Sequence, residues 1–240
     1  PELYNQLTDF LVEDLANYWR NRHALGRLGR QWIRHIYANL AAMERGTVDF
    51  YNLGELNPSG VPVVAGAGPS LEASLDFLKK NRSGLWILAA DTAVPALLDA
   101  GIRPDAIAVL ETQAWNMLDF HGTEASKISV LGDITAYPPS LMHTGGRCYF
   151  VSSRFAELKF LARLADSGLS PSPFPPLGSV GLAAVEMVMS LAGNRSPVLL
   201  TGLDFAYSPG KSHSRGSSFH HWQLAGINRL NPQPGWDASM

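Results

Sequence analysis

The segment that decides the fold is residues 63–71, VVAGAGPSL, in which a short apolar run passes through two glycines into a helical stretch. The run lacks period-two alternation, which is typical of a strand buried on both faces of a parallel sheet. Gly66 and Gly68 permit a tight turn, and Pro69 fits the first position of a helix, where a missing N–H is harmless. The segment therefore predicts a strand, a turn and a helix in succession.

The turn of this segment has the features of an anion site. The free N–H groups of the first helical turn and the helix dipole favour a phosphate, and Ser70 adds a hydroxyl donor. A third glycine of the dinucleotide fingerprint and a Walker lysine are both absent, so neither a standard NAD site nor a P-loop is predicted. We expect Gly66, Gly68, Pro69 and Ser70 to bind a nucleotide; the alternative is a tight turn without a ligand.

Apolar runs and helical stretches alternate along the rest of the chain. The apolar runs are residues 61–66, 85–90, 106–111, 128–132, 147–152 and 197–202. This alternation predicts a Rossmann-like, doubly wound α/β fold with a mostly parallel sheet and right-handed crossovers. We expect an irregular loop at the Pro-rich residues 167–176, and a loop followed by a short helix after residue 208.

The N-terminal part of the chain has a helical pattern. Apolar residues recur at helical spacing over residues 1–45, and Gly26 and Gly29 predict a break between two helices. We therefore divide the chain into an N-terminal helical segment, 1–55, and a Rossmann-like nucleotide-binding domain, 56–240. Five arginines without acidic neighbours form either a binding face for an anion or partner, or a solvated helix surface. They are Arg20, Arg22, Arg27, Arg30 and Arg34.

The composition excludes several classes of protein. With 17% charged residues and a formal net charge of −2 at pH 7, the chain has no basic excess, so nucleic acid is not an expected partner. We find no apolar run of about 18 residues and no signal peptide, so we expect no membrane partner and a cytoplasmic location. The single cysteine, Cys148, excludes an internal disulfide, and its apolar neighbours predict burial.

Polar residues follow several of the predicted strands, at the carboxyl ends where open α/β sheets bind ligands. After the second strand, Asp91 with Thr92 either bonds a ribose hydroxyl, a base or a metal, or caps the next helix. Glu111 ends the third strand and is a candidate base or metal ligand. Gly178 and Ser179 precede a helix and predict a second anion site.

The last strand is followed by the candidate catalytic residues. Asp204 comes directly after that strand, and His213 lies further along the same loop. Either side chain could act as a general acid or base, and Lys211 between them could neutralise phosphate. The adjacent His220 and His221 do not share a helix face, so they are predicted to lie on the surface and not to bind a metal.

Four segments, in this order, resemble the bacterial motility accessory factor family, which shares its central domain with the archaeal 6-hydroxymethylpterin pyrophosphokinases. They are VVAGAGPSLEASLDFL, LAADTAVPALLDAGIRPDAIAVLE, GSVGLAAVEMVMSLAG and TGLDFAYSPGKSHSRGS. The resemblance covers residues 39–216. The GAGPSL element is also similar to the GNGPSL turn of bacterial sialyltransferases that use CMP-sialic acid.

The resemblance implies a nucleotide site at residues 66–70 with Asp91 nearby, and it places residues 178–179 and 204–213 around the reacting group. This chain departs from the family at Glu111, where the family often has Asp, and at Leu203, where it commonly has Gln. The longer glutamate moves the carboxylate outward by one methylene, which weakens a metal role for it.

The resemblance implies two chemistries. Bacterial members are linked to the transfer of nonulosonic acids onto Ser or Thr of flagellin, whereas archaeal members transfer diphosphate from ATP to a pterin alcohol with magnesium. The N-terminal helices and the absence of an initial Met favour a segment of a longer, bacterial type of protein. We therefore prefer a glycosyltransferase that uses a CMP-activated, sialic-like sugar on a protein hydroxyl. The alternatives are a Mg-dependent pyrophosphokinase and a non-catalytic nucleotide-binding or scaffold module, and the oligomeric state is open.

Overall fold

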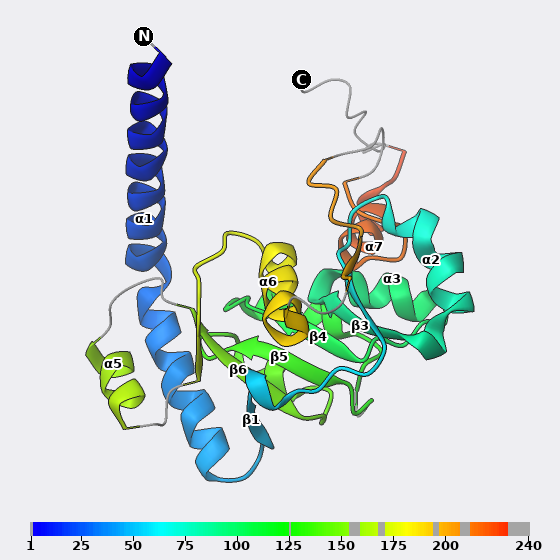
Figure 1. The fold of residues 1–240 in the computed structure, drawn as a ribbon. Coiled ribbons are helices and arrows are strands. Elements are labelled where there is room, and N and C mark those ends of the chain that lie inside the picture. The colour runs from blue at the N-terminus through cyan, green and yellow to red at the C-terminus, as the bar shows by residue number, and fades with distance from the viewer. Residues whose placement is uncertain are drawn as a thin grey trace.

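The computed structural model describes residues 2–124, 126–153, 159–167, 171–193, 197–206 and 212–229. Helices and short strands alternate along this part of the chain (Figure 1). The strands are β1 (Phe50–Asn52), β2 (Val61–Ala65), β3 (Leu85–Ala90), β4 (Ala106–Val109), β5 (Ser129–Asp133), β6 (Cys148–Ser153), β7 (Ser172–Phe174) and β8 (Leu199–Thr201). The α-helices are α1 (Glu2–Glu44), α2 (Leu71–Lys80), α3 (Val94–Asp99), α4 (Pro138–Met142), α5 (Lys159–Asp166), α6 (Val180–Ala192) and α7 (Ser218–Gly226). The 3-10 helices are η1 (Leu53–Glu55), η2 (Arg82–Gly84), η3 (Asp91–Ala93) and η4 (Ala114–Phe120).

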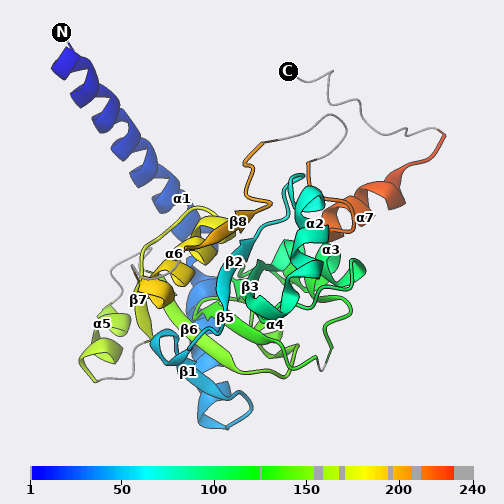
Figure 2. The same cartoon turned by 45° about the vertical axis from the view of Figure 1, so that its right-hand side comes forward.

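The described strands form one parallel sheet. Its order is β1-β6-β5-β4-β3-β2-β8, and β7 shares the outer edge of β6 with β1. The order reverses at β2, which has β3 on one side and β8 on the other (Figure 2). The crevice outside the carboxyl ends of β2 and β8 is therefore the topological switch point, where open α/β sheets bind ligands.

Helices cover both faces of the sheet. Successive side chains of a strand point to opposite faces, and both sides of β3 are buried along its whole length. One core packs Ile87 of β3 and its neighbours against α1, α2 and α3, with Leu71 and Leu97 among the buried contacts. The other core packs Leu88 against α6 through Met187. The predicted doubly wound α/β fold is confirmed.

Helix α1 runs without interruption, so the break predicted at Gly26 and Gly29 is wrong. A glycine inside a helix lowers its stability by only about 1 kcal/mol relative to alanine. The continuous helix keeps Gly29, Ile36 and Met43 on the side that packs against the body. The C-terminal half of α1 is thereby held against the sheet, while its N-terminal half projects away from the body (Figure 1).

Two strands, β1 and β7, are not predicted from the sequence. Segment 1–55 is not helical throughout, because β1 lies within it and pairs with β6. The predicted irregular segment 167–176 contains β7, and Pro173 is tolerated there because an edge strand does not need every N–H for pairing. Each of these strands has three residues, which is too short for a periodic signal.

The predictions for Cys148 and for the segment after residue 208 are both confirmed. Cys148 is fully buried in β6, as its apolar neighbours predicted. The predicted short helix after residue 208 is α7, which lies beside α3. None of the helices in the described ranges has both the length and the apolarity needed to cross a membrane.

Candidate functional site

A pocket of about 430 Å³ opens at the switch point of the sheet. The turns that follow β2, β3 and β8 meet there, and residues 179–181 at the start of α6 and residues 212–213 complete its walls. Pockets for small molecules and cofactors have volumes of this order and occur preferentially at switch points. The pocket is therefore the main candidate for a ligand site in the described part of the chain.

The turns after β2 and β8 pack directly against each other. The N–H of Gly66 donates to the carbonyl oxygen of Thr201, and the N–H of Gly68 donates to that of Gly202, both at 2.8 Å. A Cβ atom at Gly66 would overlap the carbonyl oxygen of Gly202, and one at Gly68 would overlap the carboxylate of Asp204. Contact between the two turns therefore requires these glycines, whether or not a ligand binds.

Protein groups occupy the N-terminus of α2. The N–H of Ser70 donates to Oδ2 of Asp204 at 2.9 Å, and Oγ of Ser70 accepts from the N–H of Gly202 at 3.1 Å. The N–H groups of Leu71 and Glu72 donate to carbonyl oxygens of the preceding turn. A carboxylate at a helix N-terminus satisfies the free N–H groups and the helix dipole. The turn therefore does not present the open phosphate site that the sequence predicts there.

The N-terminus of α6 faces the pocket instead. Ser179, Val180 and Gly181 all line the pocket, and the Ser179 side chain caps the helix by accepting from the N–H of Gly181 at 3.2 Å. Helix α6 has 13 residues, so its N-terminus directs a positive partial charge toward the pocket. Backbone N–H groups at such a terminus suit phosphate oxygens. The N-terminus of α6, although capped by Ser179, lines the pocket and is therefore the better candidate for the predicted anion site.

Asp91 lies in the pocket wall and is almost completely buried. Its Oδ1 accepts from the N–H of Thr92 at 2.8 Å, and its Oδ2 accepts from Nδ2 of Asn116 at 2.6 Å. Burial, reinforced by the nearby charge of Asp119, raises the pKa of Asp91 to about 7. A carboxyl group with this pKa exchanges a proton near neutral pH, as a general acid or base must.

A second pocket, of about 270 Å³, adjoins the first and shares Asp91, Thr92 and Val180 with it. The 3-10 helix η4 supplies Asn116 and Asp119, which are one turn apart and so lie on one side of it. Burial raises the pKa of Asp119, and Oδ1 of Asn116 is buried without a hydrogen-bond partner among the described residues. Trp115 lies in the wall with most of its surface exposed.

Glu111 also lines this smaller pocket, and its Oε1 accepts from the N–H of Gln113 at 3.0 Å. Within the described ranges, no group of three or more His, Cys, Asp and Glu side chains has an arrangement that could hold a metal ion. A magnesium ion beside Glu111 would therefore need further oxygen ligands from a substrate or water.

His213 lines the larger pocket. Its Nδ1 lies 3.0 Å from Oγ of Ser212, and its ring packs on Phe219 of α7 with centroids 4.9 Å apart. Burial lowers the pKa of His213, so the ring is neutral at pH 7 and can accept a proton. The N–H of Ser214 donates to the carbonyl oxygen of Ala67 at 2.7 Å, which holds this segment against the glycine turn.

The pockets gather some of the residues that the sequence predicts for the site. The predicted residues that line the larger pocket are Gly66, Gly68, Asp91, Thr92, Ser179 and His213. The predicted residues in neither lining are Pro69, Ser70, Gly178 and Asp204. Glu111 lines only the smaller pocket, and Lys211 lies outside the described residues.

Part of the site is not apparent from the sequence. Asn116 and Asp119 stand three positions apart in AWNMLDF, residues 114–120, and a 3-10 helix places such residues together. The signal was therefore two polar residues at that spacing within an apolar stretch that follows a strand. Phe205 also lines the larger pocket with φ of 47°. A left-handed conformation at a non-glycine residue is often a mark of a functional site, but the sequence does not reveal it.

Comparisons with known proteins agree with this architecture. Residues 34–210 match the family model described as "6-hydroxymethylpterin diphosphokinase MptE-like". An uncharacterized protein of Treponema pallidum (strain Nichols) is 30% identical over 222 residues, which are 90% of this chain and 39% of that protein. A second uncharacterized protein of the same organism is 31% identical over 85 residues, 35% of this chain and 39% of that protein. The chain thus matches well under half the length of each relative.

The solved structure of the MAf glycosyltransferase from Magnetospirillum magneticum AMB-1 is also similar to this chain. The TM-score is 0.53 at 19% sequence identity, over 74% of this chain and 27% of that one. At this identity the likeness shows a shared fold. The family model matches well over half of the chain, and the resemblance found in the sequence is confirmed: the chain belongs to the 6-hydroxymethylpterin diphosphokinase MptE-like family.

Proposed function

We propose that this chain is a nucleotide-dependent transferase whose larger pocket holds the phosphate of the donor at the N-terminus of α6. One observation carries the proposal. The N-terminal turn of α6, residues 179–181, opens into the pocket, whereas the corresponding end of α2 is already capped by Asp204. A phosphate at α6 would receive backbone N–H groups and the positive end of the helix dipole.

The preferred donor is a CMP-activated nonulosonic sugar, and the preferred acceptor is a protein hydroxyl such as one on flagellin. The support is the membership of the family and the fold shared with a protein described as a glycosyltransferase. The similarity of the GAGPSL turn to that of sialyltransferases points to the cytidine nucleotide. We place the reaction in the cytoplasm, and the single buried free thiol of Cys148 suits a reducing compartment.

His213 is the preferred base. In the proposed step a hydroxyl oxygen attacks the anomeric carbon, the bond from that carbon to the phosphate oxygen breaks, and CMP leaves. The hydroxyl proton passes to the neutral His213 ring, whose pKa is lowered by burial. The α6 N-terminus stabilises the charge that develops on the leaving phosphate. Asp204, the other candidate from the sequence, accepts a hydrogen bond from Ser70 and is not in the lining of the larger pocket, so it is less available for this step.

A second candidate function is magnesium-dependent transfer of diphosphate from ATP to a pterin alcohol. The observation that favours it is the smaller pocket, whose lining includes Asp91, Glu111 and Asp119, although these described side chains do not by themselves form a three-residue metal site. Magnesium is held in many phosphoryl-transfer sites by one or two carboxylates together with substrate phosphates. The family's printed description names this activity.

A pair of substitutions at Ser179 tests the phosphate site. Ser179→Asp and Ser179→Asn both keep a good N-cap on α6, but only the aspartate places a negative charge where the phosphate would lie. We expect Ser179→Asp to weaken CMP binding by about tenfold or more, measured by isothermal titration calorimetry, and Ser179→Asn to bind nearly as wild type does. Equal affinities of the two variants would contradict the proposed position of the phosphate.

The choice of donor is tested on the wild-type chain. We expect CMP and CTP to raise the melting temperature without magnesium, and CMP-activated sugar to be consumed when an acceptor is supplied. Stabilisation by ATP alone, and only with magnesium, would contradict the glycosyltransferase and favour diphosphate transfer. Nucleotide binding without turnover of either donor, in the presence of flagellin or hydroxymethylpterin, would favour a binding module.

A further inference from the structure

Helix α1 carries one apolar stripe along its length. From Tyr4 to Tyr18, apolar residues recur every three or four positions, which places them on one face of a helix; Arg22 interrupts this face, and Leu25 resumes it. Toward the C-terminus, the stripe includes Ile36, Leu40 and Met43, and it packs against the core of the sheet. The same face of the helix therefore continues from the packed half into the half that projects from the body.

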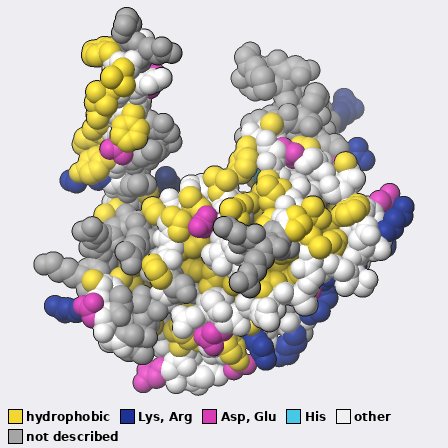
Figure 3. Space-filling view, viewed as in Figure 1, with side chains coloured by type: hydrophobic (Ala, Val, Ile, Leu, Met, Phe, Trp, Pro, Cys, Tyr) yellow, Lys and Arg dark blue, Asp and Glu magenta, His cyan; other side chains and the backbone are white. Residues whose placement is uncertain are grey.

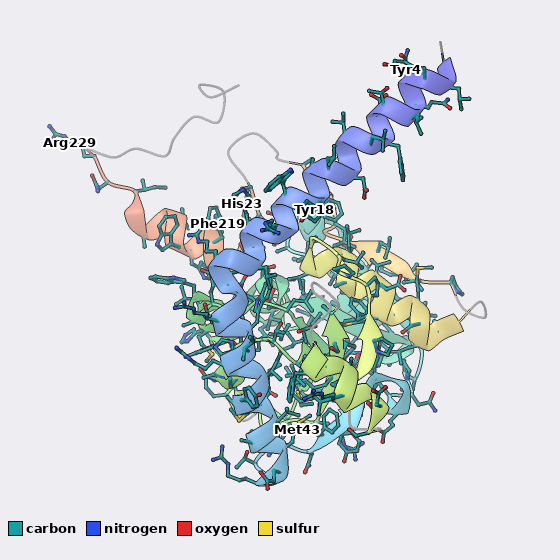
Figure 4. All side chains as sticks on the ribbon, turned by 90° about the vertical axis from the view of Figure 1, so that its left-hand side faces the viewer. Tyr4, Tyr18, His23, Met43, Phe219 and Arg229 are labelled. Atoms are coloured by element: carbon teal, nitrogen blue, oxygen red, sulfur yellow. The ribbon has the colours of Figure 1, made fainter. Side chains whose placement is uncertain are left out.

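In the projecting half this face is exposed. We call its six apolar residues the seam, and their exposed fractions lie between 38% and 72%. They are Tyr4, Leu7, Leu11, Leu15, Tyr18 and Leu25. Figure 3 shows hydrophobic side chains along this half of α1, and Figure 4 labels Tyr4 and Tyr18 on it, far from the packed end at Met43. A contiguous exposed apolar surface of this kind marks an interaction site.

The charges of α1 identify the partner of the seam. Residues 2–19 contain four acidic residues and no basic one, whereas residues 20–34 contain five arginines and no acidic residue. Asp14 and Arg22 lie four positions on either side of Tyr18, and both are exposed; Arg22 lies within the face of the seam, where Nη1 donates to the hydroxyl of Tyr18 at 3.4 Å. The helix is therefore complementary in charge to a reversed copy of itself. A parallel pair would instead bring Asp14 against Asp14 and Arg22 against Arg22.

We propose that the seam packs against the same seam of a second copy of this chain, with the two α1 helices antiparallel. Leu15 of each copy meets Tyr18 of the other, and Leu7 lies beside Leu25. Asp14 then comes within one helical turn of Arg22 of the second copy, and the pair repeats by two-fold symmetry. The contact is isologous, buries the seam of each copy from Leu7 to Leu25, and ends where each helix meets its own body. It involves neither pocket, so it is independent of the proposed function.

Sedimentation over a concentration series tests the dimer. We expect the wild-type chain to form dimers and Leu15→Asp to raise the dissociation constant by about tenfold or more. Val12→Asp is the matched control, because Val12 is also exposed on α1 but lies about 100° around the helix from Leu11; it should change the constant little. Both positions are exposed, so folding of the body, followed by circular dichroism, should be unaffected. A wild-type chain that stays monomeric at every concentration would overturn the proposal.

Charge reversal tests the orientation. Asp14→Arg should weaken the dimer by about tenfold, because an attractive pair becomes repulsive twice in each dimer. Asp14→Arg combined with Arg22→Asp should restore most of the affinity. Asp9→Arg, the same change on the side of the helix away from the seam, is the control and should have little effect. Failure of the double variant to recover would count against the antiparallel pairing.

Cross-linking provides a direct readout of the orientation. Leu7→Cys and Leu25→Cys chains, mixed and treated with a short bifunctional maleimide, should cross-link only with each other. The native thiol does not interfere, since Cys148 is buried. In a parallel pair these positions are roughly 27 Å apart, and each variant would instead cross-link to itself. Self-linking of either variant alone would overturn the antiparallel arrangement.

Discussion

The carboxylate of Asp204 accepts a hydrogen bond from the backbone N–H of Ser70 at 2.9 Å, across 134 positions of sequence. The two residues belong to the turns after β8 and β2, which lie on either side of the topological switch point. In this position Asp204 supplies the negative charge that a phosphate would bring to the N-terminus of α2. Its role in the structure is to join two turns and cap a helix.

Asp204→Ala should therefore act mainly on stability. Loss of the cap and of the charge at the helix terminus should lower the free energy of unfolding by about 1 kcal/mol, measured by urea denaturation. The control is Asp76→Ala, which changes an exposed acidic residue of α2 and should leave stability nearly unchanged. Wild-type stability together with abolished transfer would instead return Asp204 to a catalytic role.

Gly66→Ala should lower the free energy of unfolding more than the same change at a glycine whose Cβ position is empty. The new Cβ atom would overlap the carbonyl oxygen of Gly202, and rigid backbone cannot give way easily, so we expect a loss of about 2 kcal/mol or more. At Gly84 a Cβ atom would meet nothing within 4 Å, and Gly84→Ala should be tolerated. Similar melting temperatures for the two variants would show that the turns after β2 and β8 can move apart without loss of stability.

Asp91 should make stability depend on pH. Because its pKa is raised to about 7 from a usual 3.8, the folded chain keeps a proton that the unfolded chain has released between these values. Stability therefore falls as the pH rises through this window. Asp91→Asn removes the effect, so its stability relative to wild type should increase by about 2 kcal/mol between pH 5 and pH 8. Chemical denaturation at the two pH values provides the measurement.

The control for this prediction is Asp76→Asn, which changes an exposed carboxylate and should show no such trend. Asn116 already donates to the Asp91 carboxylate, and an amide at position 91 can still accept that bond. A stability difference that is the same at pH 5 and pH 8 would mean that Asp91 is ionised throughout.

His213→Ala should abolish the fall of the transfer rate at acidic pH. The neutral ring accepts the proton, and burial lowers its pKa, so the wild-type rate should rise with a midpoint below pH 6.5. The variant should lose most of the rate and this limb of the profile. His221→Ala, at an exposed position of α7, is the control and should keep both the wild-type rate and its pH dependence. An unchanged rate for His213→Ala in an active preparation would exclude it as the base.

The sequence by itself determined the order of the elements. Unbroken apolar runs such as that of β3 indicate strands buried on both faces, and helical periodicity between them leaves a parallel, doubly wound sheet as the solution. The same reasoning placed Asp91 and His213 on turns that could reach a ligand. Local patterns contain this information, because each strand or helix must hide its own apolar side.

Only the tertiary structure decided which of the candidate groups meet. Whether the N-terminus of α2 or of α6 remains open depends on Asp204, which reaches Ser70 because β8 lies beside β2. The contribution of η4 to the smaller pocket, and the continuity of α1 through Gly26 and Gly29, likewise depend on long-range packing. A local pattern of apolar residues shows which side of one segment must be buried. It does not show which other segment packs against that side, and these outcomes depend on that packing.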